Sequence, residues 1–194
     1  MRIISGSAKG CRLFSPPGRD QHIRPTSDRA REALFSIIGP DFVNKACVLD
    51  LFAGTGALGC EALSRGASHA CFIDNSKVAL ELIWKNISLI PAGQQRSKVI
   101  RYDLKNSIGP KNLMEDPQVC FDLIFADPPY QTDLSGKILH SLDNSVVLSQ
   151  KVLVIIEEKK DIRLPAELNK LVREDTRRYG DTVFAFYHRK KTAC

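Results

Sequence analysis

The sequence has no long hydrophobic run. Its longest strongly apolar run, residues 152–156 (VLVII), is five residues, whereas a membrane-spanning helix needs about 20. The first ten residues also lack the apolar segment of a secretory signal peptide. Both absences argue against membrane insertion and export, so we expect a cytoplasmic protein.

Metal-ligand motifs are missing as well. The six cysteines are at least eleven residues apart and the four histidines are equally scattered, so neither has the short spacing of a metal site. In a reducing compartment such cysteines usually act as small buried hydrophobic residues. We therefore predict no bound metal and assign the cysteines no chemistry.

What is present is the composition of an ordinary globular domain. The chain has 194 residues, 43% hydrophobic and 26% charged, without repeats or low-complexity segments. Folding a chain of this size buries roughly 70% of its unfolded surface. We expect one compact unit and a monomer.

The net charge of +6 is concentrated at the two ends. Residues 1–31 carry seven basic and two acidic residues, residues 159–194 carry ten and five, and residues 32–158 carry eleven and fifteen. Each end therefore has a net charge of +5 around an acidic middle of −4. Basic ends are typical of a protein that contacts a polyanion, but they are equally typical of solvated surfaces that maintain solubility.

Residues 1–45 are predicted to form an extension, and residues 46–194 the main domain. Residues 2–15 indicate a hairpin, because two short apolar stretches flank a polar, glycine-containing connection. Ser27 is a candidate cap for a helix over residues 28–38, whose exposed start would carry Arg24, Arg29 and Arg31.

From residue 46 onward, short apolar runs alternate with helical patterns, as in an α/β protein with a mostly parallel sheet. The expected strands are residues 46–52, 70–73, 98–102, 121–126 and 152–157. The expected helices are residues 57–65, 76–90, 134–142 and 166–171. A final antiparallel hairpin, residues 174–179 and 182–189, would turn at Gly180.

A glycine-rich turn follows the first of these strands. In residues 49–59 (LDLFAGTGALG), the glycines at 54, 56 and 59 fit G-x-G-x-x-G, and Asp74 follows Gly54 by twenty residues. Glycine lets the backbone approach an adenosine-bearing cofactor. The motif alone leaves open a nicotinamide cofactor, S-adenosylmethionine or a purely structural turn.

Asp50 begins to separate these cofactors. A carboxylate just before the glycine turn suits the cationic amino-acid end of S-adenosylmethionine better than an anionic pyrophosphate. We expect Asp74 to accept the ribose hydroxyls and Asp103, after the third strand, to lie near the adenine. A helix cap is the alternative role for Asp103.

The second motif, residues 126–130 (ADPPY), follows an apolar strand. Its prolines keep Asp127 out of the α region, fix φ and remove two backbone donors. The Asp127 carboxylate and the Pro128 carbonyl can then accept both N–H bonds of one exocyclic amine, while Tyr130 stacks on the base. The pattern indicates an amino-methyltransferase acting on a nucleic acid or another planar amide-like group, with a rigid structural turn as the alternative.

The sequence resembles the RsmD family, bacterial methyltransferases that act on guanine N2 in 16S ribosomal RNA. Besides the two motifs, the resemblance includes RIISG at residues 2–6, RPT at 24–26, REALF at 31–35 and YGDT at 179–182, and it covers nearly the whole chain. It implies a Rossmann-like class I methyltransferase fold with a mostly parallel seven-stranded sheet and an antiparallel C-terminal strand. It also implies S-adenosylmethionine as the methyl donor and 16S ribosomal RNA, within an assembling small subunit, as the partner.

These motifs and the resemblance give a set of candidate site residues. The catalytic candidates are Asp127, Pro128, Pro129 and Tyr130. The cofactor-binding candidates are Asp50, Phe52, Ala53, Gly54, Thr55, Gly56, Gly59, Asp74, Asn75, Asp103 and Leu104. The RNA-binding candidates are Arg24, Thr26, Arg29 and Arg31. The family often has Glu where this chain has Asp74, whose side chain is one methylene shorter.

Three other functions are alternatives to a 16S ribosomal RNA methyltransferase. An adenine-N6 DNA methyltransferase would use the same Asp-Pro-Pro-Tyr geometry, although only about 45 residues precede the sheet, which leaves little room for a recognition domain. A nicotinamide-dependent oxidoreductase would share the glycine turn, but Asp50 and the double proline argue against it. A noncatalytic RNA-binding module would bind RNA without binding S-adenosylmethionine.

Overall fold

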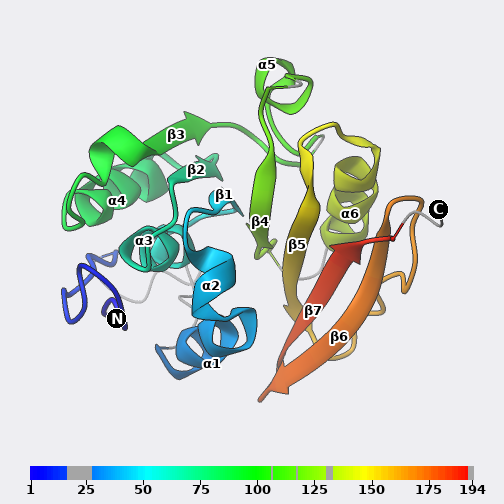
Figure 1. The fold of residues 1–194 in the computed structure, drawn as a ribbon, viewed down its shortest axis with the longest axis horizontal. Helices are drawn as coiled ribbons and strands as arrows, with labels where there is room; N and C mark the ends of the chain where they lie inside the picture. Colours follow the sequence, from blue (N-terminus) through cyan, green and yellow to red (C-terminus); the bar gives the residue numbers. More distant parts are fainter. Residues whose placement is uncertain (17–27, 106, 117, 130–132, 192–194) are drawn as a thin grey trace.

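The computed structural model describes residues 1–16, 28–105, 107–116, 118–129 and 133–191. Its strands are β1 (Cys47–Leu51), β2 (His69–Asp74), β3 (Ser97–Arg101), β4 (Phe121–Ala126), β5 (Leu148–Lys159), β6 (Leu171–Tyr179) and β7 (Thr182–Arg189). They form one seven-stranded sheet in the order β3-β2-β1-β4-β5-β7-β6 (Figure 1). Only the pairs that include β7 are antiparallel, which confirms the predicted fold class.

Helices cover both faces of this sheet. They are α1 (Asp28–Ile38), α2 (Pro40–Val43), α3 (Ala57–Ser64), α4 (Lys77–Ile87), the 3-10 helix η1 (Gln94–Arg96), α5 (Lys111–Met114) and α6 (Leu134–Asn144). Alternate residues of β1 enter two cores: Val48 packs with α1, α3 and α4, whereas Leu49 and Leu51 pack with α5 and α6. Within the described ranges, no helix combines the length and the apolar character needed to cross a bilayer.

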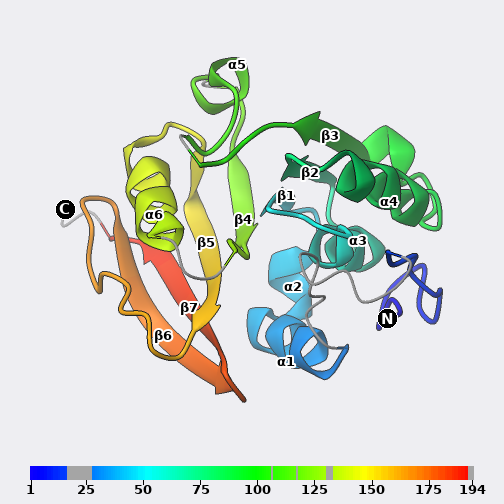
Figure 2. The same cartoon turned by 180° about the vertical axis from the view of Figure 1, so that it is seen from behind.

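The N-terminal extension begins with the predicted hairpin. Arg2 and Arg12 form an antiparallel bridge, and the backbone N–H of Ile3 donates to the carbonyl of Cys11 at 3.0 Å. Figures 1 and 2 show this hairpin beside α3 and α4, on the opposite side of the molecule from β6 and β7. The described part of the hairpin, residues 1–16, is therefore separated from the basic C-terminal strands.

The prediction of a helix over residues 166–171 is wrong, because these residues form a turn and the start of β6. Asp143, which is 1% exposed on α6, accepts backbone hydrogen bonds from Asn169, Lys170 and Leu171 at 3.0, 2.7 and 2.8 Å. The N–H of Leu168 donates to the carbonyl of Leu171 at 2.8 Å. A side chain distant in the sequence thus closes a turn that leads into β6. The last parallel strand is also longer than the predicted residues 152–157, because β5 covers Leu148–Lys159.

Candidate active site

The candidate site lies where adjacent parallel strands end. Leu51 of β1 is in register with Ile73 of β2 and with Ala126 of β4, so the residues that follow these strands share one edge of the sheet. This is the edge at which open α/β sheets bind ligands. The glycine turn, Asp74 and Asp127 are therefore brought together as their positions in the sequence predict.

The glycine turn runs from Phe52 to the start of α3. Its backbone has positive φ at Phe52 (57°), Gly54 (55°) and Gly56 (71°). Gly56 is the left-handed N-terminal cap residue of α3, a conformation that glycine adopts without a Cβ clash. The third glycine of the motif has a packing role: a Cβ at Gly59 would lie 2.3 Å from the Phe72 ring.

Asp50 lies beneath this turn rather than at its surface. The residue is only 3% exposed, and its Oδ2 accepts the backbone N–H of Gly59 at 2.9 Å. Burial raises the pKa of Asp50 to about 7; the Gly59 hydrogen bond opposes this shift and the negative charge of Asp74 adds to it. Asp50 therefore joins β1 to α3, and its contact with a cationic ligand stays a prediction.

Asp74 holds the turn from the neighbouring strand. Its Oδ2 accepts the N–H of Gly54 at 2.9 Å, and its Oδ1 accepts the N–H of Ser76 at 2.9 Å. The residue is half-buried, and the next residue, Asn75, is exposed. Each Asp74 oxygen accepts one backbone hydrogen bond and retains a lone pair, so this carboxylate has capacity for ribose hydroxyls.

Asp103 follows β3 on an exposed loop. Its Oδ1 accepts the N–H of Lys105 at 3.1 Å, which is an Asx turn. The next described helix, α5, begins only at Lys111, so the helix-cap alternative for Asp103 is wrong. Leu104 beside it is buried, at 4% exposure.

The catalytic candidates follow β4. The N–H of Asp127 approaches the carbonyl of Leu51 at 3.5 Å, which places this residue beside the end of β1. Asp127 is half-buried, Pro128 is buried and Pro129 is exposed. Tyr130 lies outside the described residues, so its stacking role stays a prediction.

The RNA-binding candidates divide into three cases. Arg24 and Thr26 lie outside the described residues, and Arg29 is exposed on α1. The expectation that Arg31 is exposed is wrong, because this residue is 0% exposed. Its Nη2 donates to Asp28 at 2.9 Å and to the carbonyl of Arg2, and its Nε lies 3.7 Å from Glu61. Arg31 therefore fastens α1 to the hairpin.

Glu61 is a structural residue that the sequence reasoning missed. This α3 side chain is 0% exposed and accepts the N–H groups of Ile4 and Ser5 at 2.8 and 3.0 Å, and Nε of Arg65 at 2.7 Å. Nearby, a Cβ on Gly6 (φ 85°) would lie 1.8 Å from a backbone oxygen of α3. The sequence signal for this role is the single acid within the mostly apolar helix ALGCEALS, which indicates a buried carboxylate that needs hydrogen-bond partners.

Asn86 joins the hairpin to the glycine turn. This α4 side chain is 0% exposed; its Oδ1 accepts the N–H of Phe14 at 2.7 Å. Its Nδ2 donates to the carbonyl of Phe14 at 3.1 Å and to that of Thr55 at 2.8 Å. Thr55 lies between the first two motif glycines, so one buried amide connects the extension with the candidate cofactor loop.

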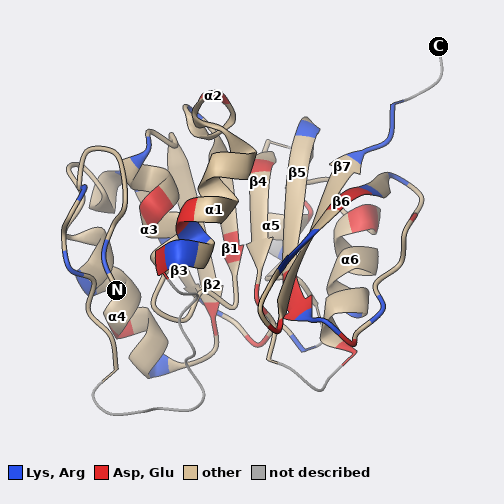
Figure 3. Cartoon of the chain, turned by 90° about the horizontal axis from the view of Figure 1, so that it is seen from below, with Lys and Arg blue, Asp and Glu red and all other residues tan. Residues whose placement is uncertain are grey.

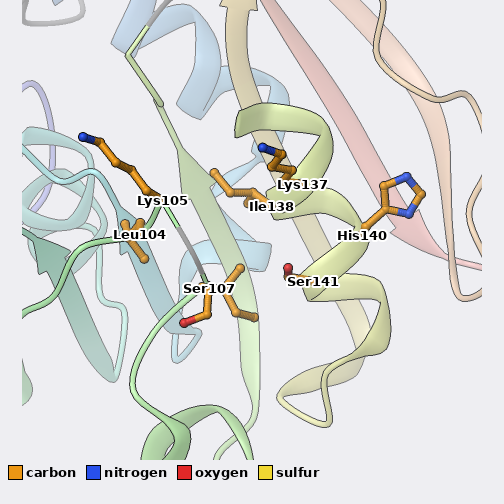
Figure 4. Close-up of a pocket in the computed structure, with 8 residues that line it drawn as sticks. Leu104, Lys105, Ser107, Lys137, Ile138, His140 and Ser141 are labelled. Atoms are coloured by element: carbon orange, nitrogen blue, oxygen red, sulfur yellow. The ribbon is translucent and has the colours of Figure 1, made fainter. Parts of the chain in front are cut away.

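A groove of about 290 Å³ lies between the loop after β3 and α6. Figure 4 shows Lys105 on the loop and Lys137 on the helix at its two sides. Its lining includes the buried residues Leu104, Ile108 and Ile138. Of the cofactor-binding candidates only Leu104 lines it, so this basic groove adjoins the candidate site without containing the glycine turn.

Comparison with known proteins places these features in context. Residues 1–188 match the family model described as "Conserved hypothetical protein 95". The chain is 33% identical over 190 residues to "Putative rRNA methyltransferase YlbH" of Bacillus subtilis, covering 98% of this chain and 100% of that protein. It is 34% identical over 167 residues to "Ribosomal RNA small subunit methyltransferase D" of Escherichia coli, and the alignment covers 85% of this chain and 78% of that protein.

The fold is also similar to that of a solved structure. The solved structure "Putative methyltransferase yhhF from Escherichia coli" superposes with a TM-score of 0.82 at 26% identity, covering 98% of both chains. The match includes the hairpin, the sheet and the C-terminal strands, because nearly the whole chain is aligned.

Proposed function

This chain belongs to the RsmD family of S-adenosylmethionine-dependent methyltransferases, and from that membership we propose that it methylates the N2 amine of a guanine in 16S ribosomal RNA. The observation that carries the proposal is the end of β4, where Asp127-Pro128-Pro129 lies beside the glycine turn after β1. The names of the relatives support a small-subunit ribosomal RNA substrate, and the Asp-Pro-Pro turn supports an amine as acceptor.

The residues around the glycine turn fit the methyl donor. Asp50 and Asp74 lie close enough that the charge of Asp74 raises the pKa of Asp50. A positively charged ligand relieves this repulsion, and the donor has both a sulfonium and an ammonium group. We assign its binding to these two acids, the turn from Phe52 to Gly56, and the loop residues Asn75, Asp103 and Leu104. When bound, the donor supplies an activated methyl group.

Asp127 and Pro128 act on the acceptor. The Asp127 carboxylate and the Pro128 carbonyl accept the two N–H bonds of the guanine amine, which orients the nitrogen lone pair toward the methyl group. Tyr130 stacks on the base. Asp127 then receives the proton that the amine loses, directly or through water. Most of the rate enhancement comes from this positioning, since the donor is already reactive.

The extension supplies RNA affinity in this proposal. Arg29 is exposed at the start of α1, and Arg24 and Thr26 belong to the same basic segment. Phosphate contacts of this kind weaken as salt concentration rises. We assign recognition to folded RNA in an assembling small subunit.

The direct test is product identification. The protein is incubated with labelled S-adenosylmethionine and, separately, with unmodified small subunits, naked 16S ribosomal RNA and adenine-rich DNA, and methylated nucleosides are identified by mass spectrometry. N2-methylguanosine from the ribosomal RNA is the expected product. N6-methyladenine would overturn the substrate and support the DNA alternative, and RNA binding without cofactor binding would support a noncatalytic module.

A further inference from the structure

The N-terminal hairpin places two arginines directly opposite each other. Arg2 and Arg12 form the antiparallel bridge, flanked by Ile3 N–H to Cys11 at 3.0 Å and Leu13 N–H to the carbonyl of Met1 at 3.2 Å. These flanking bonds make the arginines a non-hydrogen-bonded pair, the register in which facing side chains lie closest. Ile3 and Leu13 are buried, at 1% and 4% exposure, whereas both arginines are exposed.

The guanidinium groups of this pair have no acidic partner among the described residues. Asp28 is near, but its Oδ1 accepts Nη2 of Arg31 at 2.9 Å and the backbone N–H of Arg2 at 3.4 Å. Like charges opposite each other across two strands are destabilising. An anion held between the two guanidinium groups removes that repulsion.

An exposed aromatic residue continues the same face. Phe14 is two residues after Arg12, is 49% exposed, and follows the buried Leu13, so strand alternation places it on the side of Arg12. Its backbone N–H and carbonyl are both bonded to the buried amide of Asn86. The ring is thus presented to solvent from a fixed backbone.

We propose that this outer face of the hairpin (Arg2, Arg12 and Phe14) binds an unpaired nucleotide of the RNA, with its base on the Phe14 ring and its phosphate between the arginines. Aromatic rings next to cationic side chains bind single-stranded nucleic acid in this way, and arginine is suited to phosphate. The identity of the RNA rests on the proposed function. The docking face is separate from the basic segment of residues 24–31.

Binding of a fluorescein-labelled single-stranded oligoribonucleotide to the full chain, measured by anisotropy over a range of salt, tests this. Arg12→Glu should weaken binding about tenfold and reduce the salt slope by about 0.7 for each phosphate that the variant no longer neutralises. Phe14→Leu should weaken it about tenfold, while Phe14→Tyr, which keeps the ring, should stay within about twofold.

Lys9→Glu is the matched control, because Lys9 is an exposed cation in the connection of the same hairpin. It should change affinity far less than Arg12→Glu; equal losses would show a general charge effect and overturn the docking face. Unchanged affinity for S-adenosylmethionine in every variant confirms that the fold is intact.

A methylation assay on small subunits separates this inference from the proposed function. If subunits are methylated while Arg12→Glu and Phe14→Leu bind the oligoribonucleotide as the wild type does, the docking face is wrong and the function stands. If both variants lose RNA binding but the wild type itself forms no N2-methylguanosine, the docking face stands and the proposed function is wrong.

Discussion

The two ends of the chain have the same net charge, +5, but their basic side chains are arranged differently. Figure 3 shows Lys and Arg on the N-terminal hairpin at one side, on α1 near the middle, and along β6 and β7 at the other side. In the C-terminal region three of the five acids form ion pairs with Lys or Arg: Glu167 with Lys190, Asp175 with Arg177, and Asp181 with Lys160. A fourth acid, Glu174, lies 3.1 Å from Nε2 of His188. Arg173, Arg178 and Arg189 donate to backbone carbonyls.

The N-terminal extension uses one cation internally and leaves the others exposed. Arg31 is buried and fastens α1 to the hairpin. Arg2, Lys9, Arg12 and Arg29 are exposed, and their side chains form no ion pair with the described residues. The two ends thus have equal net charge, but more of the described basic side chains lack an ion pair at the N-terminal end, and we propose that this end contacts the RNA.

The largest effect should come from breaking the attachment of the extension. Glu61→Ala removes the acceptor for Ile4, Ser5 and Arg65 and leaves buried donors unsatisfied, so it should lower the free energy of unfolding by about 3–5 kcal/mol. Urea denaturation measures this. Glu81→Ala, an exposed acid on α4, is the control and should stay within about 0.5 kcal/mol; a similar small loss for Glu61→Ala would contradict the fastening role.

Asp127→Ala should lower the rate of methyl transfer without changing the structure of either end of the chain. We expect turnover to fall by about 10², equivalent to about 2.7 kcal/mol in the barrier, because the amine loses its acceptor. Affinities for S-adenosylmethionine and RNA should stay near those of the wild type. Near-normal turnover in single-turnover assays would refute the assignment of Asp127.

Asp50 sharpens the charge comparison, because at pH 7 it contributes only about half of the negative charge that is formally counted for it in the middle of the chain. With a folded pKa of about 7 against an ordinary 3.8, the folded protein keeps this proton while the unfolded chain loses it. Stability should therefore fall as pH rises from about 4 to about 7, by up to about 1.4 kcal/mol per pH unit. Urea denaturation across this range should give a flatter slope for Asp50→Asn; an unchanged slope would argue against the raised pKa.

The smallest effect should come from surface charges at the two ends. The double reversal Arg24→Glu/Arg29→Glu should weaken RNA binding about fivefold and lower the salt slope, since both residues are assigned to phosphates. Arg178→Glu, whose Nε bonds a carbonyl within its own hairpin, should change it less than twofold. Equal effects at the two ends would remove the distinction drawn between them.

Local sequence patterns predicted most elements. The helix over residues 28–38 and the strand over 121–126 have the bounds observed for α1 and β4, because apolar periodicity is a local signal. The predicted cap, Ser27, lies outside the described residues. The acids after adjacent strands also meet as expected, since parallel strand ends share one edge. The two motifs were therefore sufficient to locate the candidate site.

Long-range polar contacts account for what the sequence did not predict. Asp143 meets residues 26 to 28 positions away, and Asn86 meets Phe14 72 positions away. Periodicity carries no information about such pairs, so it predicts a helix over residues 166–171 and an exposed Arg31, and both predictions are wrong. Asp50 fits its motif, but only the packing of α3 on β1 shows that its carboxylate faces inward.

The buried amide of Asn86 limits how the N-terminal hairpin can be transferred to another protein by design. A hairpin transplanted onto another methyltransferase would leave its Phe14 backbone groups without partners unless an equivalent of Asn86 were already present on the recipient's helix. The same holds for Ile4 and Ser5, which depend on Glu61. The transferable unit is therefore a scattered set of residues on both sides of position 45, and a chimera designed by cutting at that position would separate the hairpin from the groups that hold it.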